Sequence, residues 1–211
     1  SLTTNVLTRT TKAYTRYATL VADGSVNVDA KTSDTTVSTV VGIGVAASPN
    51  KGVSVTGSAN TTNVTATTQA RLGAHTHVDA NDDVIVDATH DALIVDVAGQ
   101  GGFGGQVAAG GAAEVVLFNS DTLAEVGQDA EVDAGGLVGV YADASPLVVS
   151  VAGAGNVSGK GTAVSATTSN ILFGVGSVDS LVELKNTSRP KTQGALFETE
   201  PLTNTVKARV G

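Results

Sequence analysis

Residues 124–155, with the sequence AEVGQDAEVDAGGLVGVYADASPLVVSVAGAG, repeat the apolar pattern of residues 70–101, ARLGAHTHVDANDDVIVDATHDALIVDVAGQG, 54 positions further along the chain. Alanine, valine, leucine and glycine return at matching places, whereas the polar residues between them change. The triplet Val78-Asp79-Ala80, for example, returns as Val132-Asp133-Ala134. A buried face shared by both copies explains this pattern, because burial restricts a position to apolar residues and exposure does not.

The composition favours strands throughout. The 211 residues are 41% hydrophobic but only 3% aromatic, with 25 Gly and without Trp, Cys or Met. The core must therefore be built from valine, alanine, leucine and isoleucine. Valine and threonine suit strands, glycine, asparagine and aspartate suit turns, and the helical spacing of about 3.6 residues is absent. We therefore predict an all-β protein.

Runs of alternating apolar and polar residues predict short strands with one buried face. Four runs are expected to point the following residues into the core: Val26, Val28 and Ala30; Val84, Val86 and Ala88; Leu93, Val95, Val97 and Gly99; Leu147, Val149, Val151 and Gly153. Brief turns are expected to separate the strands at Asn81–Asp83, Thr89–Asp91, Gly135–Gly136 and Asp143–Pro146.

A repeat of short strands with an apolar inner face cannot close a core alone, but stacked repeats can. We predict a parallel β-helix, right-handed, with about three short strands in each coil. Coils of about 18–20 residues would make the 54-residue unit three coils, and the chain without residues 174–203 nine or ten. A β-sandwich is the alternative fold, but it does not explain a constant register.

Further copies of the unit flank these two. Val28-Asp29-Ala30 matches Val78-Asp79-Ala80 in an earlier, shorter copy, and Ala208-Arg209-Val210-Gly211 resembles Ala70-Arg71-Leu72-Gly73. Residues 174–203 break both the repeat and the composition, so we expect an insertion there. Residues 1–211 are thus interpreted as one β-helix segment of a longer protein.

These repeats resemble the passenger regions of large bacterial surface adhesins of the filamentous-haemagglutinin and autotransporter type, and above all leukotoxin-like filamentous adhesin repeats. The stretches that carry the resemblance are residues 63–70, 97–113, 124–127, 132–134, 138–140 and 147–155. The resemblance implies a rod-like β-helix that is exported to the cell surface and serves adhesion. It does not transfer a toxic activity to this chain.

Charge and residue content exclude several classes of protein. The formal net charge is −8, which argues against nucleic-acid binding, because that requires a basic face. The absence of cysteine excludes a disulfide scaffold, a zinc ribbon and a thiol nucleophile. No apolar run reaches the roughly 18–20 residues that a membrane-spanning helix needs.

Two groups of side chains could bind a cation. His75, His77 and Asp79 are expected on the outward face of one strand, with His90 and Asp91 nearby, and two histidines with a carboxylate can hold a divalent metal. Asp29, Asp79 and Asp133 recur at one position of the repeat. With three coils in each unit they would lie about 14 Å apart, too far for one ion. We therefore interpret both groups as solvated surface and predict neither metal nor cofactor.

An enzyme is the alternative function, because polysaccharide lyases and glycosidases also use β-helices. The acids that lie closest together in the sequence are Asp82, Asp83, Asp87 and Asp91, but their spacing is typical of turns and outward strand positions. We predict no catalytic residues.

The insertion is the best place for recognition, because binding residues of solenoids often lie in loops on one face. It carries Lys185, Arg189 and Lys191 in an otherwise acidic chain. The expected partner is a glycan or protein on a host or neighbouring cell. The open ends of the β-helix could also associate end to end, because they expose strand edges.

Overall fold

The computed structural model describes residues 1–46, 48, 51–174 and 205–210. Within these residues the chain forms eleven strands and no helix. The strands are β1 (Leu2–Thr15), β2 (Thr19–Ala22), β3 (Val26–Val45), β4 (Val53–Leu72), β5 (His77–Ala80), β6 (Val84–Gly104), β7 (Val107–Val126), β8 (Glu131–Ala134), β9 (Val138–Ser158), β10 (Thr162–Phe173) and β11 (Thr205–Val210). The prediction of an all-β protein is confirmed.

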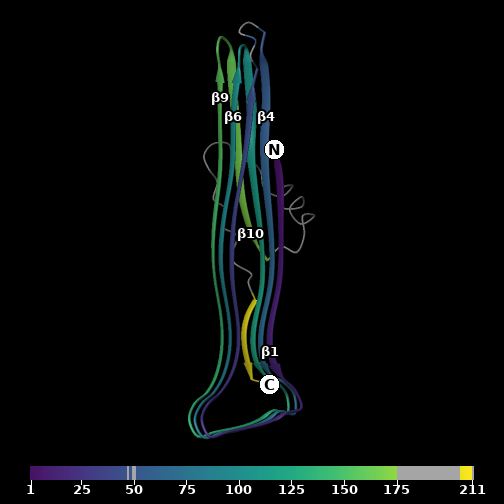
Figure 1. Ribbon diagram of the computed structural model, residues 1–211, viewed down its shortest axis with the longest axis vertical. Helices are drawn as coiled ribbons and strands as arrows, with labels where there is room; N and C mark the ends of the chain where they lie inside the picture. Colours follow the sequence, from purple (N-terminus) through teal and green to yellow (C-terminus); the bar gives the residue numbers. More distant parts are fainter. Residues whose placement is uncertain (47, 49–50, 175–204, 211) are drawn as a thin grey trace.

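The strands form three parallel sheets, as a parallel β-helix requires. The first has the order β1-β4-β7-β10, with β11 also paired to β7; the others have the orders β2-β5-β8 and β3-β6-β9. Each coil therefore consists of a long strand, a short strand and a second long strand. Figure 1 shows the long strands running up and down the molecule, with the short strands joining them at one end. We call this end the closed end.

The predicted coil length is wrong. β4 pairs with β7, β5 with β8 and β6 with β9, each time between residues 54 positions apart. One repeat is therefore one coil and not three. The expected turns at Thr89–Asp91 and Asp143–Pro146 lie inside β6 and β9, which run on uninterrupted. Pro146 is tolerated there because β9 is an edge strand of its sheet, where a missing backbone N–H need not break a ladder.

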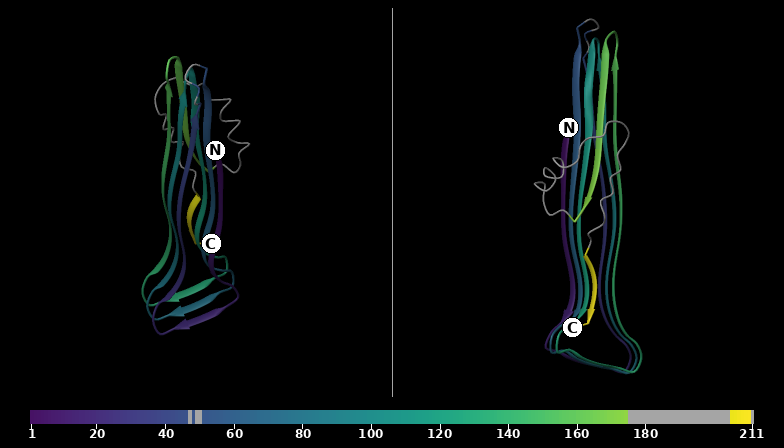
Figure 2. Two further views of the ribbon diagram at one scale, coloured as in Figure 1. Left: turned by 45° about the horizontal axis from the view of Figure 1, so that its top comes forward. Right: turned by 180° about the vertical axis from the view of Figure 1, so that it is seen from behind.

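Long coils change the shape of the molecule. At about 3.3 Å per residue, a strand of 20 residues such as β4 spans roughly 66 Å, whereas each stacked coil adds only about 4.8 Å. The longest dimension therefore follows the strands, as both views in Figure 2 show. The expected rod of nine or ten small coils is replaced by a few broad, flat ones.

The first copy also aligns differently from the expectation. β3 pairs with β6 so that Val28 lies beside Val86, and not beside Val78. The triplet Val-Asp-Ala occurs on two strands of the second coil, at residues 78–80 and 86–88, which is why the short motif misled the alignment. By contrast, the expected match of the chain end is confirmed, because Ala208 pairs with Ala124.

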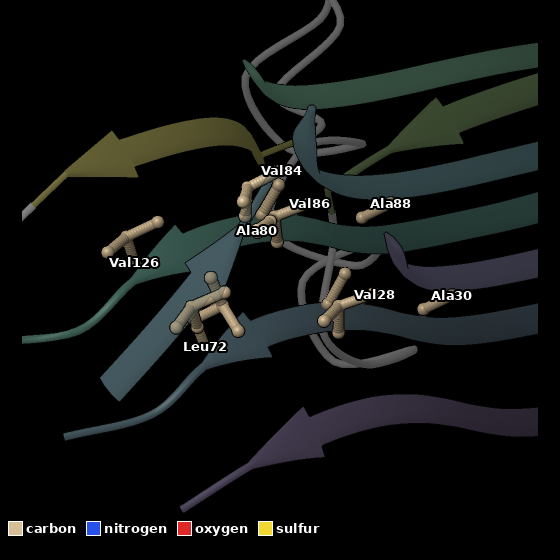
Figure 3. Close-up of a cluster of buried hydrophobic side chains, with 11 residues drawn as sticks. Val28, Ala30, Leu72, Ala80, Val84, Val86, Ala88 and Val126 are labelled. Carbon is tan, nitrogen blue, oxygen red and sulfur yellow. The ribbon is translucent and has the colours of Figure 1, made fainter. Parts of the chain in front are cut away.

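The closed end holds the main apolar core. Residues from all three sheets meet there, as Figure 3 shows for Leu72 of β4, Ala80 of β5 and Val84 of β6. The buried members are Val28, Ala30, Ala70, Leu72, Val78, Ala80, Val84, Val86, Ala88, Ala124 and Val126. The inward orientation predicted for Val28, Ala30, Val84, Val86 and Ala88 is thus confirmed.

The orientation predicted for the other two runs is wrong. Because β6 is continuous from Val84, its even-numbered residues stay inside along its whole length, and Ala92, Ile94 and Ala98 are buried. The valines and leucines at odd positions therefore point outward. The same holds in β9, where Leu147 is 59% exposed and Val151 51%.

The middle of the molecule has a second apolar cluster around Phe118. Its buried members are Val64, Ala92, Ile94, Val116 and Phe118. The Phe118 ring stacks on His90 at 5.8 Å and meets Phe173 edge-on at 5.6 Å. Aromatic pairs in these geometries add stability beyond the area they bury.

Replacing Phe118 by alanine should destabilise the fold by about 3–5 kcal/mol, because it leaves a cavity between two close-packed sheets. Urea unfolding followed by circular dichroism measures the loss. Tyr14→Ala is the matched control, since Tyr14 is 68% exposed, and it should cost less than about 1 kcal/mol. Equal losses for the two variants would contradict the packing described here.

Candidate functional site

The recognition residues predicted from the sequence, Lys185, Arg189 and Lys191, lie outside the described residues. The strands on either side of them are described. β10 ends with Phe173 beside Phe118, and β11 begins with Thr205 beside Asp121, both on β7. Only Asn119 and Ser120 of β7 separate these two pairings, so the described strands before and after residues 175–204 lie against neighbouring parts of β7.

The outer face of the β3-β6-β9 sheet is unusually apolar. Away from the closed end, six outward positions on each strand carry no charged side chain. We call these eighteen positions the apolar face: Thr35, Val37, Thr39, Val41, Ile43 and Val45 of β3; Leu93, Val95, Val97, Gly99, Gly101 and Phe103 of β6; Leu147, Val149, Val151, Gly153, Gly155 and Val157 of β9. Exposed apolar patches of this kind mark interaction sites in soluble proteins.

Exposure is highest on the edge strands of the apolar face, reaching 69% at Val37 and 79% at Ile43 of β3, whereas Val95 and Val97 of the central strand β6 are partly buried. Closer to the closed end, the same sheet presents charged residues at its outward positions: Asp29, Lys31, Asp87, Asp91 and Asp143. The outer face of this sheet is thus divided along the strands into a charged part and a charge-free part.

Four glycines lie together within the apolar face: Gly99, Gly101, Gly153 and Gly155. A side chain added at Gly153 or Gly155 would meet nothing within 4 Å, and one at Gly99 or Gly101 would make only ordinary contacts of 3.6 Å or more. The packing of this chain therefore does not require glycine at these positions. Glycine weakens a strand interior and often marks a place where another backbone approaches closely.

Carboxyl groups occupy the interior behind the apolar face. Asp96 and Glu114 are both fully buried, and Asn60 Nδ2 donates a hydrogen bond of 3.2 Å to Glu114 Oε1. With both groups ionised, both oxygens of Asp96 and Oε2 of Glu114 lack a close donor within the described residues, and the Thr62 side chain only partly offsets the effect of burial on the pKa of Asp96. A proton on Glu114, donated toward Asp96, resolves part of this deficit.

The environment favours that proton. Burial, and then the negative charge of Asp96, raise the pKa of Glu114 to about 7. Burial also raises the pKa of Asp96. The two acids thus behave as a coupled pair that keeps a proton well above the pH at which an exposed carboxyl group loses it.

A buried histidine adds a second polar layer between the two apolar clusters. Ser120 Oγ lies 2.7 Å from His90 Nδ1, and Asp34 Oδ2 lies 3.2 Å from His90 Nε2. Arg9 Nε pairs with Asp34 Oδ1 at 2.8 Å. Serine, histidine and aspartate in contact resemble a hydrolase triad, but all three side chains are enclosed by the β-helix. In a serine hydrolase the substrate carbonyl must reach the serine hydroxyl, whereas Ser120 is buried here.

Sequence reasoning missed both interior groups. Asp34 and Asp96 were not singled out, and His90 was expected in a turn and beside the candidate metal ligands. The partners of these residues lie 18 to 56 positions away. The alternation of side chains along β6 could have identified them. In an unbroken strand that starts with Val84 inside, every second residue points inward, and these residues include His90 and Asp96.

The residues considered for metal binding do not converge. His75 lies in a turn with a φ of 56°, and not in a strand as expected, and its ring stacks on Tyr17. His77 Nδ1 lies 3.2 Å from Glu131 Oε2 on the next coil. Asp79 pairs with Asp133 in adjacent coils, closer than the predicted 14 Å separation. No group of three potential metal ligands occurs in the part of the chain that the structure describes.

The acids considered for catalysis have structural positions. Asp82 and Asp83 lie in the turn before β6, and Asp83 Oδ1 accepts a 2.7 Å hydrogen bond from the backbone N–H of Leu137. Asp87 and Asp91 point outward from β6. A shallow depression elsewhere on the surface is lined by Ser58, Gly111, Ala112, Ala113, Ala166, Thr167 and Thr168, without an acid or a base.

The buried acid pair predicts how stability depends on pH. Between pH 4.5 and about 7 the folded state holds a proton that the unfolded chain has lost, so the free energy of unfolding falls as the pH rises through this window. The contribution of Glu114 is complete below the window, absent above it, and on the order of 3 kcal/mol.

Glu114→Gln should abolish most of this dependence, because the amide stays neutral at every pH. Urea midpoints at pH 5 and pH 8 measure it: the variant should match the parent chain at pH 5 and exceed it at pH 8. Asp96→Asn should also flatten the profile, and the double variant should add little, since the two acids share one proton. Additive effects would show that the acids titrate independently.

Comparison of the chain with protein families, with curated proteins and with solved structures gave no match. The likeness to bacterial adhesin repeats therefore stays a prediction that rests on the residues quoted above. Within the described residues there is also no helix of the length and apolarity that crossing a membrane requires.

Proposed function

We propose that this chain is a structural segment of a secreted bacterial surface adhesin, in which a stiff β-helix holds a binding region away from the cell. The observation that carries the proposal is the unbroken pairing of long strands. β4 pairs with β7 over twenty successive residues, and β6 pairs with β9 over twenty-one. A coil held by such ladders resists bending and local opening, which suits a spacer.

The interior supports a mechanical role. Small apolar residues of successive coils stack on one another at the closed end: Ala70 on Ala124, and Leu72 on Val126. Such columns let further coils of the same pattern be added without a change in cross-section. The two faces of the stack, where β3 and β9 are edge strands, present backbone groups suited to pairing with more coils.

An enzymatic function has no support from a particular observation. Buried His90 and the Asp96–Glu114 pair are closed off from substrate, and the exposed acids near Asp83 hold a turn together. Polysaccharide-active enzymes need acids that face each other across an accessible cleft. We therefore favour the structural role over a lyase or glycosidase.

Within this proposal, adhesion is assigned to residues 174–203, with Lys185, Arg189 and Lys191 as the contacts. Three cations close together on a chain of net charge −8 suit an acidic glycan or an acidic protein surface. The assignment rests on the sequence and on the positions beside β7 where β10 ends and β11 begins.

Deleting residues 176–204 tests both halves of the proposal. The deletion joins residue 175 to Thr205, which keeps Thr205 in register with Asp121 of β7, so the β-helix should fold as before. Binding of the labelled chain to epithelial cells and to immobilised acidic glycans should be lost, and the combined variant K185A/R189A/K191A should reproduce the loss.

Two outcomes would contradict the proposal. Undiminished binding by the deletion variant would move recognition to the β-helix itself. Release of reducing ends or unsaturated sugars from a polysaccharide panel, by the parent chain at catalytic turnover, would establish an enzyme instead. Thermal unfolding of each variant provides the control for folding.

A further inference from the structure

We propose that the apolar face is a dimerisation surface, on which a second copy of this chain packs with its strands antiparallel to the first. The proposal is independent of the adhesin assignment, because it rests on the outer face of the β3-β6-β9 sheet alone. Three features of that face carry it: its area, its freedom from charge and the arrangement of its valines and glycines.

The area fits a stable dimer. Three strands about 4.8 Å apart, each contributing eleven residues at about 3.3 Å, cover roughly 500 Å² on one copy. Two copies would bury about 1,000 Å², which is where specific interfaces begin. A sheet face of this size, with exposures of 55% at Val41 and 79% at Ile43, would leave much apolar surface in water if it stayed uncovered.

The parts of the face on β6 and β9 are complementary to themselves. Outward positions of β6 read Val95, Val97, Gly99, Gly101, and the paired positions of β9 read Val149, Val151, Gly153, Gly155. A two-fold axis that crosses the strands between Val97 and Gly99 reverses this order in the partner. Each of the four glycines then faces a valine of the second copy. The facing pairs are Gly99 and Val97, Gly101 and Val95, Gly153 and Val151, and Gly155 and Val149.

This complementarity also gives the glycines a physical reason. The chain itself leaves room for a side chain at all four positions. A valine that projects from the partner sheet fills that room, and facing sheets pack at about 10 Å only when their side chains interdigitate in this way.

Charge selects the antiparallel arrangement over the parallel one. Asp87, Asp91 and Asp143 lie on the same sheet face, toward the closed end. If the two copies had parallel strands, Asp87 and Asp91 of the central strand β6 would meet their own counterparts, and like charges brought together in an interface are costly. The antiparallel arrangement sends the two closed ends to opposite ends of the dimer, beyond the partner's apolar face.

The mass of the 211-residue chain in solution tests the proposal. Sedimentation velocity should give about twice the chain mass of 20.9 kDa at micromolar concentration. Gly153→Leu should sediment as a monomer, because the leucine occupies the space intended for the partner's Val151, while the chain itself has nothing within 4 Å of that position. The urea midpoint of the monomeric variant, measured at low concentration, should match that of the parent chain.

Gly57→Val is the matched control. Gly57 also faces outward from a long strand with room for a side chain, but it lies on the other long sheet, and this variant should remain a dimer. A monomeric parent chain up to about 100 µM would overturn the proposal. A dimer that persists in Gly153→Leu would overturn it as well, and would point to pairing of strand edges.

Single cysteines test the orientation, since the chain has none of its own. In the antiparallel dimer, Gly99→Cys lies next to the two-fold axis and should form a covalent dimer with a short bismaleimide. Leu93→Cys should not, because its counterpart lies about ten residues, or roughly 33 Å, away along the strand. Efficient cross-linking of Leu93→Cys would overturn the antiparallel arrangement. These readouts do not involve cell binding, so they fail or succeed separately from the adhesin proposal.

Discussion

The 54-residue backbone ladder is the constraint on which the rest of this structure depends. Each residue of β4 is paired in register with a residue one full coil later, in β7, and β6 is held to β9 in the same way. A slip of one residue would turn every side chain of a strand to the opposite face. The ladder therefore fixes which side chains are enclosed in all coils at once.

The position of a residue in the in–out alternation of its strand, and not its polarity, decides whether its side chain is buried. This explains the unusual distribution of side chains. Near the closed end the alternation and polarity agree, and Val84 and Val86 are buried. Further along the same strand they disagree: Asp96 lies inside and Val97 outside. The in–out alternation of the strand cannot be reversed without a bulge or turn. Acids therefore remain in the interior, where they share a proton, and apolar residues remain on the outer face.

The two polar layers of the interior and the apolar face are thus parts of one arrangement. Burial raises the pKa of Glu114, so the Asp96–Glu114 pair is sensitive to pH. This pair lies directly behind the sheet that we propose as the dimer surface. His90, held between Ser120 and Asp34, separates the apolar cluster of the closed end from that around Phe118. Buried polar groups of this kind can specify register, because other pairings would leave them without partners.

By itself, the sequence determined the strand class, the parallel stacking and the 54-residue period. The matching residue types of Val132 and Val78, and of Ala208 and Ala124, indicated pairs that the structure places side by side on neighbouring strands. Only the tertiary structure decided that one period is one coil, and which residues of β6 beyond His90 point inward. Both depend on whether a strand continues through a polar residue, and that is decided by partners on distant strands and not by local propensity.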